Sequence, residues 1–142
     1  FNKRLVKMPK LYFYDVGLVS WLLGIQTQEQ ITTHPLRGNL FETLIVSELI
    51  KSRMNQGKRP DLFYWRDSNG NEVDVIAEWE AKIKPIEIKS GKTLTLESFS
   101  GLKKWMVLAK NTGESPTLIY GGEEKYMQHG IQVTGWKDNL NF

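Results

Sequence analysis

The chain has 142 residues, no cysteine and two histidines, and its 19 Lys and Arg against 16 Asp and Glu give a formal net charge of +3. The lack of cysteine excludes disulfides, thiolate zinc sites and cysteine nucleophiles, and it favours a reducing cytoplasmic location. No apolar run approaches the roughly 20 residues of a membrane span, so we expect no membrane partner. His34 and His129 lie far apart in sequence, which argues against a histidine-rich metal centre.

The chain begins without an initiator methionine or a signal peptide, and we expect it to be a module of a longer polypeptide. Its length fits one compact unit. Within that unit we assign residues 1–35 to a small N-terminal strand–helix appendage with its linker. Residues 36–142 form the main α/β domain.

In the appendage, "KLYFYD" (residues 10–15) predicts a short aromatic strand. Asp15 is placed to cap the helix of "VGLVSWLL", which Gly24 ends. The segment "TQEQITTHPLRGN" (residues 27–39) is typical of a loop that leads into the main domain.

The main domain opens with the strongest helical pattern, "NLFETLIVSELIKSRM" at residues 39–54. The hairpin turn "DSNG" and a second turn or short loop, "AKIK" (residues 81–84), separate the next strands. The remaining predicted elements are strands at 62–66, 71–80 and 85–90, a helix at 95–109, and short strands at 116–122 and 130–136. This α–β–β–β–α–β order with a trailing strand predicts an α/β fold with a mixed central sheet flanked by helices.

Charged residues interrupt two of these strands. Alternation predicts that one face of the second strand carries Glu72, Asp74, Ile76 and Glu78, and that the other carries Val73, Val75 and Ala77. In "PIEIK", Glu87 and Lys89 share a face in the same way. If the strands are neighbours, Asp74 and Glu87 lie side by side.

Two adjacent carboxylates are what a Mg²⁺ site requires, because Mg²⁺ prefers hard oxygen ligands. Lys89 beside such an ion would orient or deprotonate an attacking water, or offset charge on a phosphate. A solvated sheet face with a Glu–Lys pair gives the same pattern without any metal.

A helix glutamate in "LFETLIVSELI", a hairpin, Asp74 in "EVDVI" and then Glu87-Ile88-Lys89 together resemble the PD-(D/E)XK superfamily of restriction-endonuclease-like nucleases. Nearly the whole chain is similar to the C-terminal domain of unknown function 4143 of bacterial and archaeal AAA-type ATPases. The segments that carry this second resemblance are "KLYFYDVGLVSWLLG", "RGNLFETLIVSELIK", "FYWRDSNGNEVDVIAE", "PIEIKSG", "IYGGEE" and "GIQVTGWKD".

The resemblance implies a restriction-endonuclease-like αβββαβ core and Mg²⁺-dependent phosphodiester hydrolysis, with Mn²⁺ as a substitute. Asp74, Glu87 and Lys89 match the catalytic residues, and the implied metal ligands are Glu42, Asp74, Glu87 and the backbone carbonyl of Ile88. The implied partners are DNA and an upstream ATPase domain of the same polypeptide, which would hold any ATP.

Several alternatives stay open. Glu48 competes with Glu42 for the place of the helix acid, and Glu72 is a further candidate to assist. Val73 stands where the superfamily motif has proline. The rival function is a catalytically silent module that binds DNA or protein for the ATPase, since the chain has no G-x-x-x-x-G-K-[ST] phosphate loop of its own. A third possibility, a toxin or antitoxin partner linked to such ATPases, is not distinguished from these two functions by the sequence. The sequence also does not give the DNA or RNA preference or the oligomeric state.

Overall fold

The computed structural model describes residues 9–80, 82–110 and 114–138. A six-stranded mixed sheet with the order β1-β2-β3-β4-β6-β5 forms the centre of this part of the chain. Its strands are β1 (Leu62–Arg66), β2 (Glu72–Trp79), β3 (Lys82–Lys89), β4 (Thr117–Tyr120), β5 (Tyr126–Gln128) and β6 (Ile131–Gly135). The first three strands form an antiparallel meander, β4 and β6 run parallel to β3, and β5 is antiparallel to β6 at the far edge.

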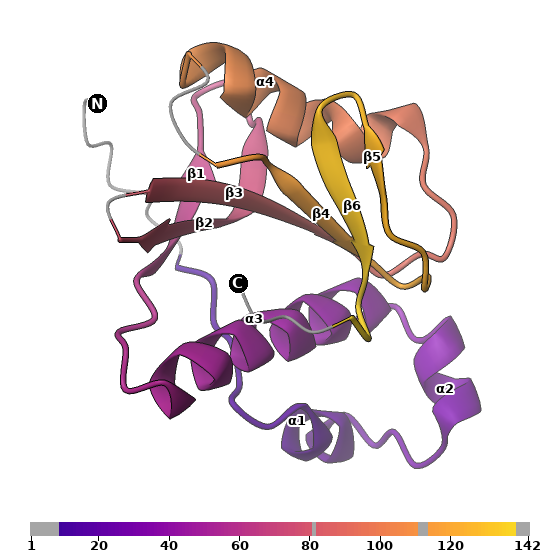
Figure 1. Cartoon of the computed structure of the whole chain (residues 1–142). Helices are drawn as coiled ribbons and strands as arrows, with labels where there is room; N and C mark the ends of the chain where they lie inside the picture. Colours follow the sequence, from indigo (N-terminus) through magenta and orange to yellow (C-terminus); the bar gives the residue numbers. More distant parts are fainter. Residues whose placement is uncertain (1–8, 81, 111–113, 139–142) are drawn as a thin grey trace.

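Helices cover both faces of the sheet (Figure 1). Helix α3 (Arg37–Asn55) crosses one face, while the 3-10 turn η1 (Leu96–Phe99) and helix α4 (Ser100–Leu108) cover the other. The predicted mixed α/β architecture is confirmed, with α4 as the crossover that joins the parallel strands β3 and β4. No helix in the described ranges is long and apolar enough to span a lipid bilayer.

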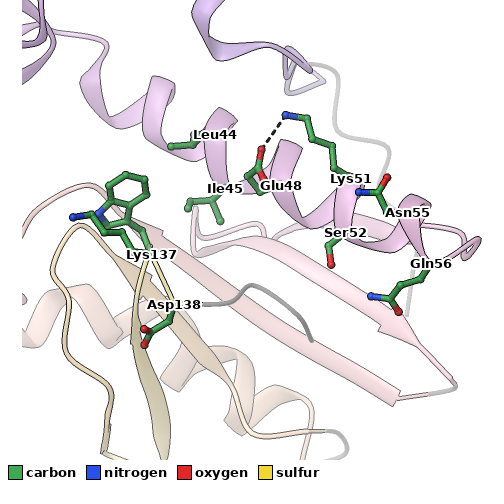
Figure 2. A pocket seen from close by; sticks show the side chains of 10 residues that line it. Leu44, Ile45, Glu48, Lys51, Ser52, Asn55, Gln56, Lys137 and Asp138 are labelled. Carbon is green, nitrogen blue, oxygen red and sulfur yellow. Dashed lines mark hydrogen bonds and ion pairs between the residues drawn. The ribbon is translucent and has the colours of Figure 1, made fainter.

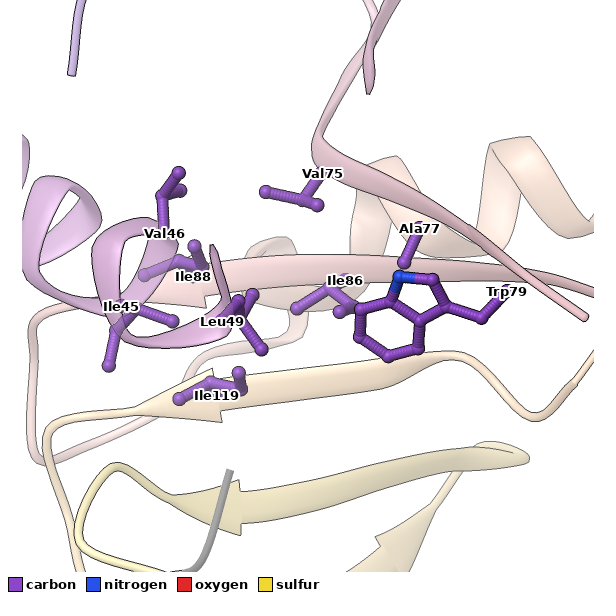
Figure 3. Packing of buried hydrophobic residues seen from close by; sticks show 9 residues of the cluster. All are labelled: Ile45, Val46, Leu49, Val75, Ala77, Trp79, Ile86, Ile88 and Ile119. Atoms are coloured by element: carbon purple, nitrogen blue, oxygen red, sulfur yellow. The ribbon is translucent and has the colours of Figure 1, made fainter. Parts of the chain in front are cut away.

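Two apolar clusters pack on opposite faces of the sheet. Under α3, as Figure 3 shows, Ile45, Val46 and Leu49 point at the strands because they share one side of the helix. The strand residues that complete this cluster are Val75, Ala77, Trp79, Ile86, Ile88 and Ile119. The cluster under α4 consists of Val73, Phe99, Leu102, Trp105, Leu118, Tyr120, Ile131 and Val133. Full burial of one such large side chain contributes about 1.5–3 kcal/mol, so both clusters hold the sheet in place.

A bulge in β2 breaks the predicted alternation of faces. The register with β1 shifts by one residue between the Phe63–Ile76 and Trp65–Val73 pairs, so β2 carries one extra residue there. Val73 therefore packs under α4 together with Ile76, whereas Val75 packs under α3. The prediction that Val73 and Val75 share a face is wrong, because the bulge turns the strand between them.

The N-terminal segment is not a strand. No strand in the described part of the chain pairs with residues 10–15, and the segment instead contacts α3 through its side chains. Helix α1 (Val16–Leu22) does begin at Asp15, whose carboxylate accepts a hydrogen bond from the Leu18 N–H at 3.0 Å, and the chain turns at Gly24 with a φ of 72°. The helix cap was therefore predicted correctly from the sequence, whereas the prediction of a strand at residues 10–15 was wrong.

Two predicted loops contain regular structure. Residues 27–39 include helix α2 (Gln28–Thr33), which a capping box between Thr27 and Gln30 starts, and α3 begins at Arg37 rather than at residue 39. The capping box is a local signal that the sequence carries.

The second loop prediction was wrong at its C-terminal end. Of the predicted "AKIK" turn, residue 81 lies outside the described residues and the other three belong to β3, because Trp79 pairs directly with Lys82. Strand β5 was not predicted; it joins β6 through His129 and Gly130, which have φ values of 54° and 75°.

Gly101 lets α4 approach the sheet closely. A Cβ atom at this position would lie 2.4 Å from the carbonyl oxygen of Glu72. We expect Gly101→Ala to lower the free energy of unfolding by about 1–3 kcal/mol, because the backbone of β2 must move to relieve the clash. Urea unfolding of the variant and the wild type measures the difference.

Gly38 is the matched control, since a Cβ atom added to this helical glycine would meet nothing within 4 Å. Gly38→Ala is expected to be as stable as the wild type or up to about 1 kcal/mol more stable. Equal unfolding midpoints for Gly101→Ala and the wild type would show that α4 does not depend on this close approach.

Candidate functional site

The acids that interrupt the strands gather where β2 and β3 stop pairing. The β2–β3 ladder ends at the pair Val75–Ile86, and beyond it the Oδ2 atom of Asp74 accepts a hydrogen bond of 2.9 Å from the Ile88 N–H. The side chain of Asp74 thus replaces a backbone partner, and it is buried. Burial and the charge of Glu42 raise the pKa of Asp74, while the hydrogen bond from Ile88 lowers it.

Glu87 has one paired and one unpaired oxygen. Its Oε1 accepts a hydrogen bond of 2.6 Å from Lys89 Nζ, whereas its buried Oε2 has no hydrogen-bond partner among the residues that the structure describes. Only 5% of the residue is exposed. Burial, and then the charge of Asp74, raise the pKa of Glu87 to about 7, although Lys89 opposes this change. An unpaired buried carboxylate oxygen costs stability unless a ligand satisfies it.

Lys89 stands beside Glu87 as a cation. Burial alone would lower its pKa, but the charge of Glu87 and the hydrogen bond between the two outweigh burial, so the pKa of Lys89 is raised. At neutral pH the amine therefore keeps its proton. Of the three roles that the sequence left open, orienting a water and offsetting charge on a phosphate fit this protonation state, and deprotonating a water does not.

A polar groove of about 390 Å³ adjoins this pair. Glu87 and Lys89 line it together with Glu72, whose Oε2 accepts a hydrogen bond of 2.9 Å from the Tyr64 hydroxyl. The rest of the lining comes from the β1–β2 turn, from η1 with its N-cap and from the start of α4, namely Gly70, Asn71, Thr95, Glu97, Ser98, Ser100 and Gly101. Because the lining combines hydroxyl, amide and ammonium donors with three carboxylates, an anionic ligand fits this groove only together with a cation that offsets the carboxylates.

On the side of α3, the N-terminal segment reaches the same acids. Lys10 Nζ lies 2.9 Å from Glu42 Oε1 and 3.3 Å from Asp74 Oδ1. The Tyr12 hydroxyl donates a 2.5 Å hydrogen bond to Glu42 Oε1. Sequence reasoning missed both residues, since nothing in a six-residue aromatic segment shows that it contacts a helix 30 residues later.

The structure separates the two candidate helix acids. Glu48 lines another groove, of about 580 Å³, where it forms a 2.9 Å ion pair with Lys51 (Figure 2). Of the two, Glu42 is the one that shares a partner, Lys10, with Asp74.

The donor chemistry suits Mg²⁺, but the acids are not assembled around one point. Glu42, Asp74 and Glu87 supply only hard carboxylate oxygens, and one of these oxygens is unpaired. Yet the described ranges contain no group of three His, Cys, Asp or Glu residues close enough to hold a metal ion. The ammonium of Lys10 lies between two of the three acids, so the residues fit a metal ion only if Lys10 moves away.

Fold and site together define a mixed α/β domain with a polar groove in which the buried Glu87 meets Lys89 on β3. The chain belongs to the family called domain of unknown function 4143, which matches residues 37–138 and confirms that part of the sequence-based resemblance.

The chain is 30% identical over 92 residues to an uncharacterized protein of Mycobacterium bovis and, to the same extent, to one of Mycobacterium tuberculosis. Each match covers 65% of this chain and 20% of the relative, so the chain spans about a fifth of the length of the curated relatives it matches. No solved structure matches the chain.

Proposed function

We propose that this domain is a PD-(D/E)XK-type, restriction-endonuclease-like nuclease that hydrolyses phosphodiester bonds in DNA. The observation that carries the proposal is Glu87, a buried carboxylate with a pKa of about 7, an unpaired Oε2 and a lysine on its other oxygen. Perturbed carboxylates beside a groove are typical of catalytic sites. A buried oxygen without a partner indicates a missing ligand.

Further support comes from the order of the elements and from the size of the relatives. The element order α3-β1-β2-β3-α4-β4 agrees with the αβββαβ order expected for that superfamily. The relatives are about three times as long as this chain, which leaves room for an AAA-type ATPase domain as the partner in the same polypeptide and as the ATP-binding part. We propose residues 1–35 as the appendage to this nuclease domain, because the family match begins at residue 37.

In this proposal Glu42, Asp74, Glu87 and the backbone carbonyl of Ile88 would hold Mg²⁺, which supplies Lewis-acid stabilisation and an activated water. The protein's own residues do the rest. Glu87 must be ionised, so its proton has to leave to solvent near neutral pH. The ammonium of Lys89 offsets charge that develops on the phosphate oxygens, and the hydroxyl and amide groups of the groove position the strand.

Cleavage assays on plasmid, single-stranded and branched DNA with Mg²⁺ or Mn²⁺ test the proposal. Asp74→Asn keeps the shape of the side chain but removes its charge, and we expect it to lower the cleavage rate at least about 100-fold. Glu48→Gln, in the other groove, is expected to cleave as fast as the wild type. Cleavage that persists in EDTA, equal rates for Asp74→Asn and the wild type, or no cleavage by any variant would contradict the assignment.

A catalytically silent binding module is the second candidate. The position of Lys10 favours it, because an internal ammonium already neutralises part of the acidic pair. A ligand that binds the native state raises the thermal midpoint. If Mn²⁺ leaves the midpoint of the wild type unchanged while the protein still retards DNA in a gel, the binding module is the correct function.

A further inference from the structure

An ammonium group of the chain itself occupies the space between two of the proposed metal ligands. Lys10 Nζ is 2.9 Å from Glu42 Oε1 and 3.3 Å from Asp74 Oδ1, and it lies 4.6 Å from the centre of the Tyr64 ring. Two carboxylates and an aromatic face form a cation-binding pocket. The side chains of Lys10 and Asp74 are 27% and 9% exposed, so solvent screens this pocket only in part.

The segment that delivers Lys10, residues 9–15, is held by few contacts. Tyr12 packs against the cluster under α3 and donates its hydroxyl proton to Glu42 Oε1 at 2.5 Å. No strand in the described ranges pairs with the segment, and Leu11 and Tyr14 are 80% and 64% exposed. Such a segment opens at a smaller free-energy cost than a core strand, because it breaks few buried contacts.

We infer that residues 9–15 form a strap whose Lys10 competes with the divalent metal ion for Glu42 and Asp74 and so keeps the site closed. The inference rests on the proposed metal site. A divalent ion at these oxygens would repel an ammonium a few ångströms away, so the two do not share the pair. Because Lys10 is tethered, its effective concentration at the acids is high, and it weakens metal binding without any added competitor.

The strap also accounts for a feature that the metal site alone leaves unexplained. Lys10 lies outside residues 37–138, the part of the chain that matches the family, yet its ammonium contacts Asp74, 64 positions later in the sequence. In the strapped form this ammonium offsets one of the two negative charges of Glu42 and Asp74.

Lys10→Met tests the strap, since methionine keeps much of the apolar stem and removes the charge. Mn²⁺ affinity, followed at pH 8 through the electron paramagnetic resonance signal of free Mn²⁺, is expected to increase about tenfold or more over the wild type, because the competing state is gone. Lys51→Met, which removes the ion pair with Glu48 in the other groove, is the matched control and is expected to bind Mn²⁺ as the wild type does.

Tyr12→Phe serves as a second variant. It keeps the ammonium and the apolar packing but removes the hydroxyl bond to Glu42, so a smaller gain of the same sign is expected. In the wild type, saturating Mn²⁺ should also make the peptide bonds of residues 10–15 easier for a protease to cleave, because the strap is displaced. That readout does not depend on catalysis.

The possible outcomes distinguish between the strap, the metal site and the nuclease. Equal or weaker Mn²⁺ binding by both variants than by a wild type that does bind overturns the strap and leaves the metal site intact. Tighter binding by Lys10→Met without any DNA cleavage supports the strap and overturns the nuclease. Absence of Mn²⁺ binding by the wild type and by both variants overturns the strap and the metal site together.

Discussion

Replacing Glu87 with glutamine is expected to make the protein more stable than the wild type at pH 8 and about equally stable at pH 4.5. The cause is the pKa of Glu87, which burial and the charge of Asp74 raise from 4.5 to about 7 in the folded protein. Between these two values the unfolded chain has released the proton while the folded protein still holds it. The stability of the wild type therefore falls as the pH rises through this window and stays low above it.

The size of this effect follows from the gap between the two pKa values. At about 1.4 kcal/mol for each pKa unit, the gap corresponds to at most about 3 kcal/mol, which would make it one of the larger single-residue contributions in the domain. Glutamine has the shape of the protonated side chain and has no proton to lose, so the variant does not pay this cost above pH 7. Urea unfolding at pH 4.5, 6 and 8, in buffers with EDTA, gives the difference.

Glu48→Gln controls for removal of a negative charge as such. Glu48 is a helix glutamate with a half-exposed side chain and an ion pair with Lys51, and we expect a change below about 0.5 kcal/mol at each pH. If Glu87→Gln were less stable than the wild type at pH 8, the ionised carboxylate would have to be stabilised by the fold. The interpretation of Glu87 as a strained acid that awaits a ligand would then be wrong.

Local patterns predicted most of the elements. The aromatic run of β1, the Asn-Gly turn and the alternating residues of β3 each carry their own signal, and Asp15 capped its helix as expected. The bulge in β2 has no such signal, because it depends on how residues 63–65 pair with residues 73–76 in three dimensions. A one-residue shift moves side chains to the opposite face, so predictions from strict alternation failed beside Asp74.

The part of the candidate site that the sequence predicted lies on the adjacent strands β2 and β3. Glu87 and Lys89 are two residues apart on β3, and alternation places them together, as the 2.6 Å hydrogen bond between them shows. Lys10 and Tyr12 reach Glu42 over sequence separations of 32 and 30 residues. No local periodicity encodes contacts of that range, and the aromatic pattern of residues 10–15 wrongly predicted a strand.

Lys89→Met is expected to lower the DNA cleavage rate at least about 100-fold at pH 7.5, for two separable reasons. The ammonium that offsets charge on the phosphate is lost. In addition, the pKa of Glu87 rises above its wild-type value of about 7, because in the wild type the charge and the hydrogen bond of Lys89 lower it. A protonated Glu87 binds metal poorly, so Mn²⁺ affinity at pH 7 should fall as well.

A change of pH separates the two reasons. Raising the pH favours the ionised form of Glu87 even without Lys89, so at pH 9 we expect the Mn²⁺ affinity of Lys89→Met to move toward that of the wild type while cleavage stays low. Lys82→Met is the matched control: Lys82 begins the same strand, is exposed and pairs with Glu114, so both readouts should follow the wild type. If cleavage by Lys89→Met recovered at pH 9 together with metal binding, Lys89 would act only by keeping Glu87 ionised. Its ammonium would then have no direct part in stabilising the phosphate, and the groove would owe its chemistry to the carboxylates alone.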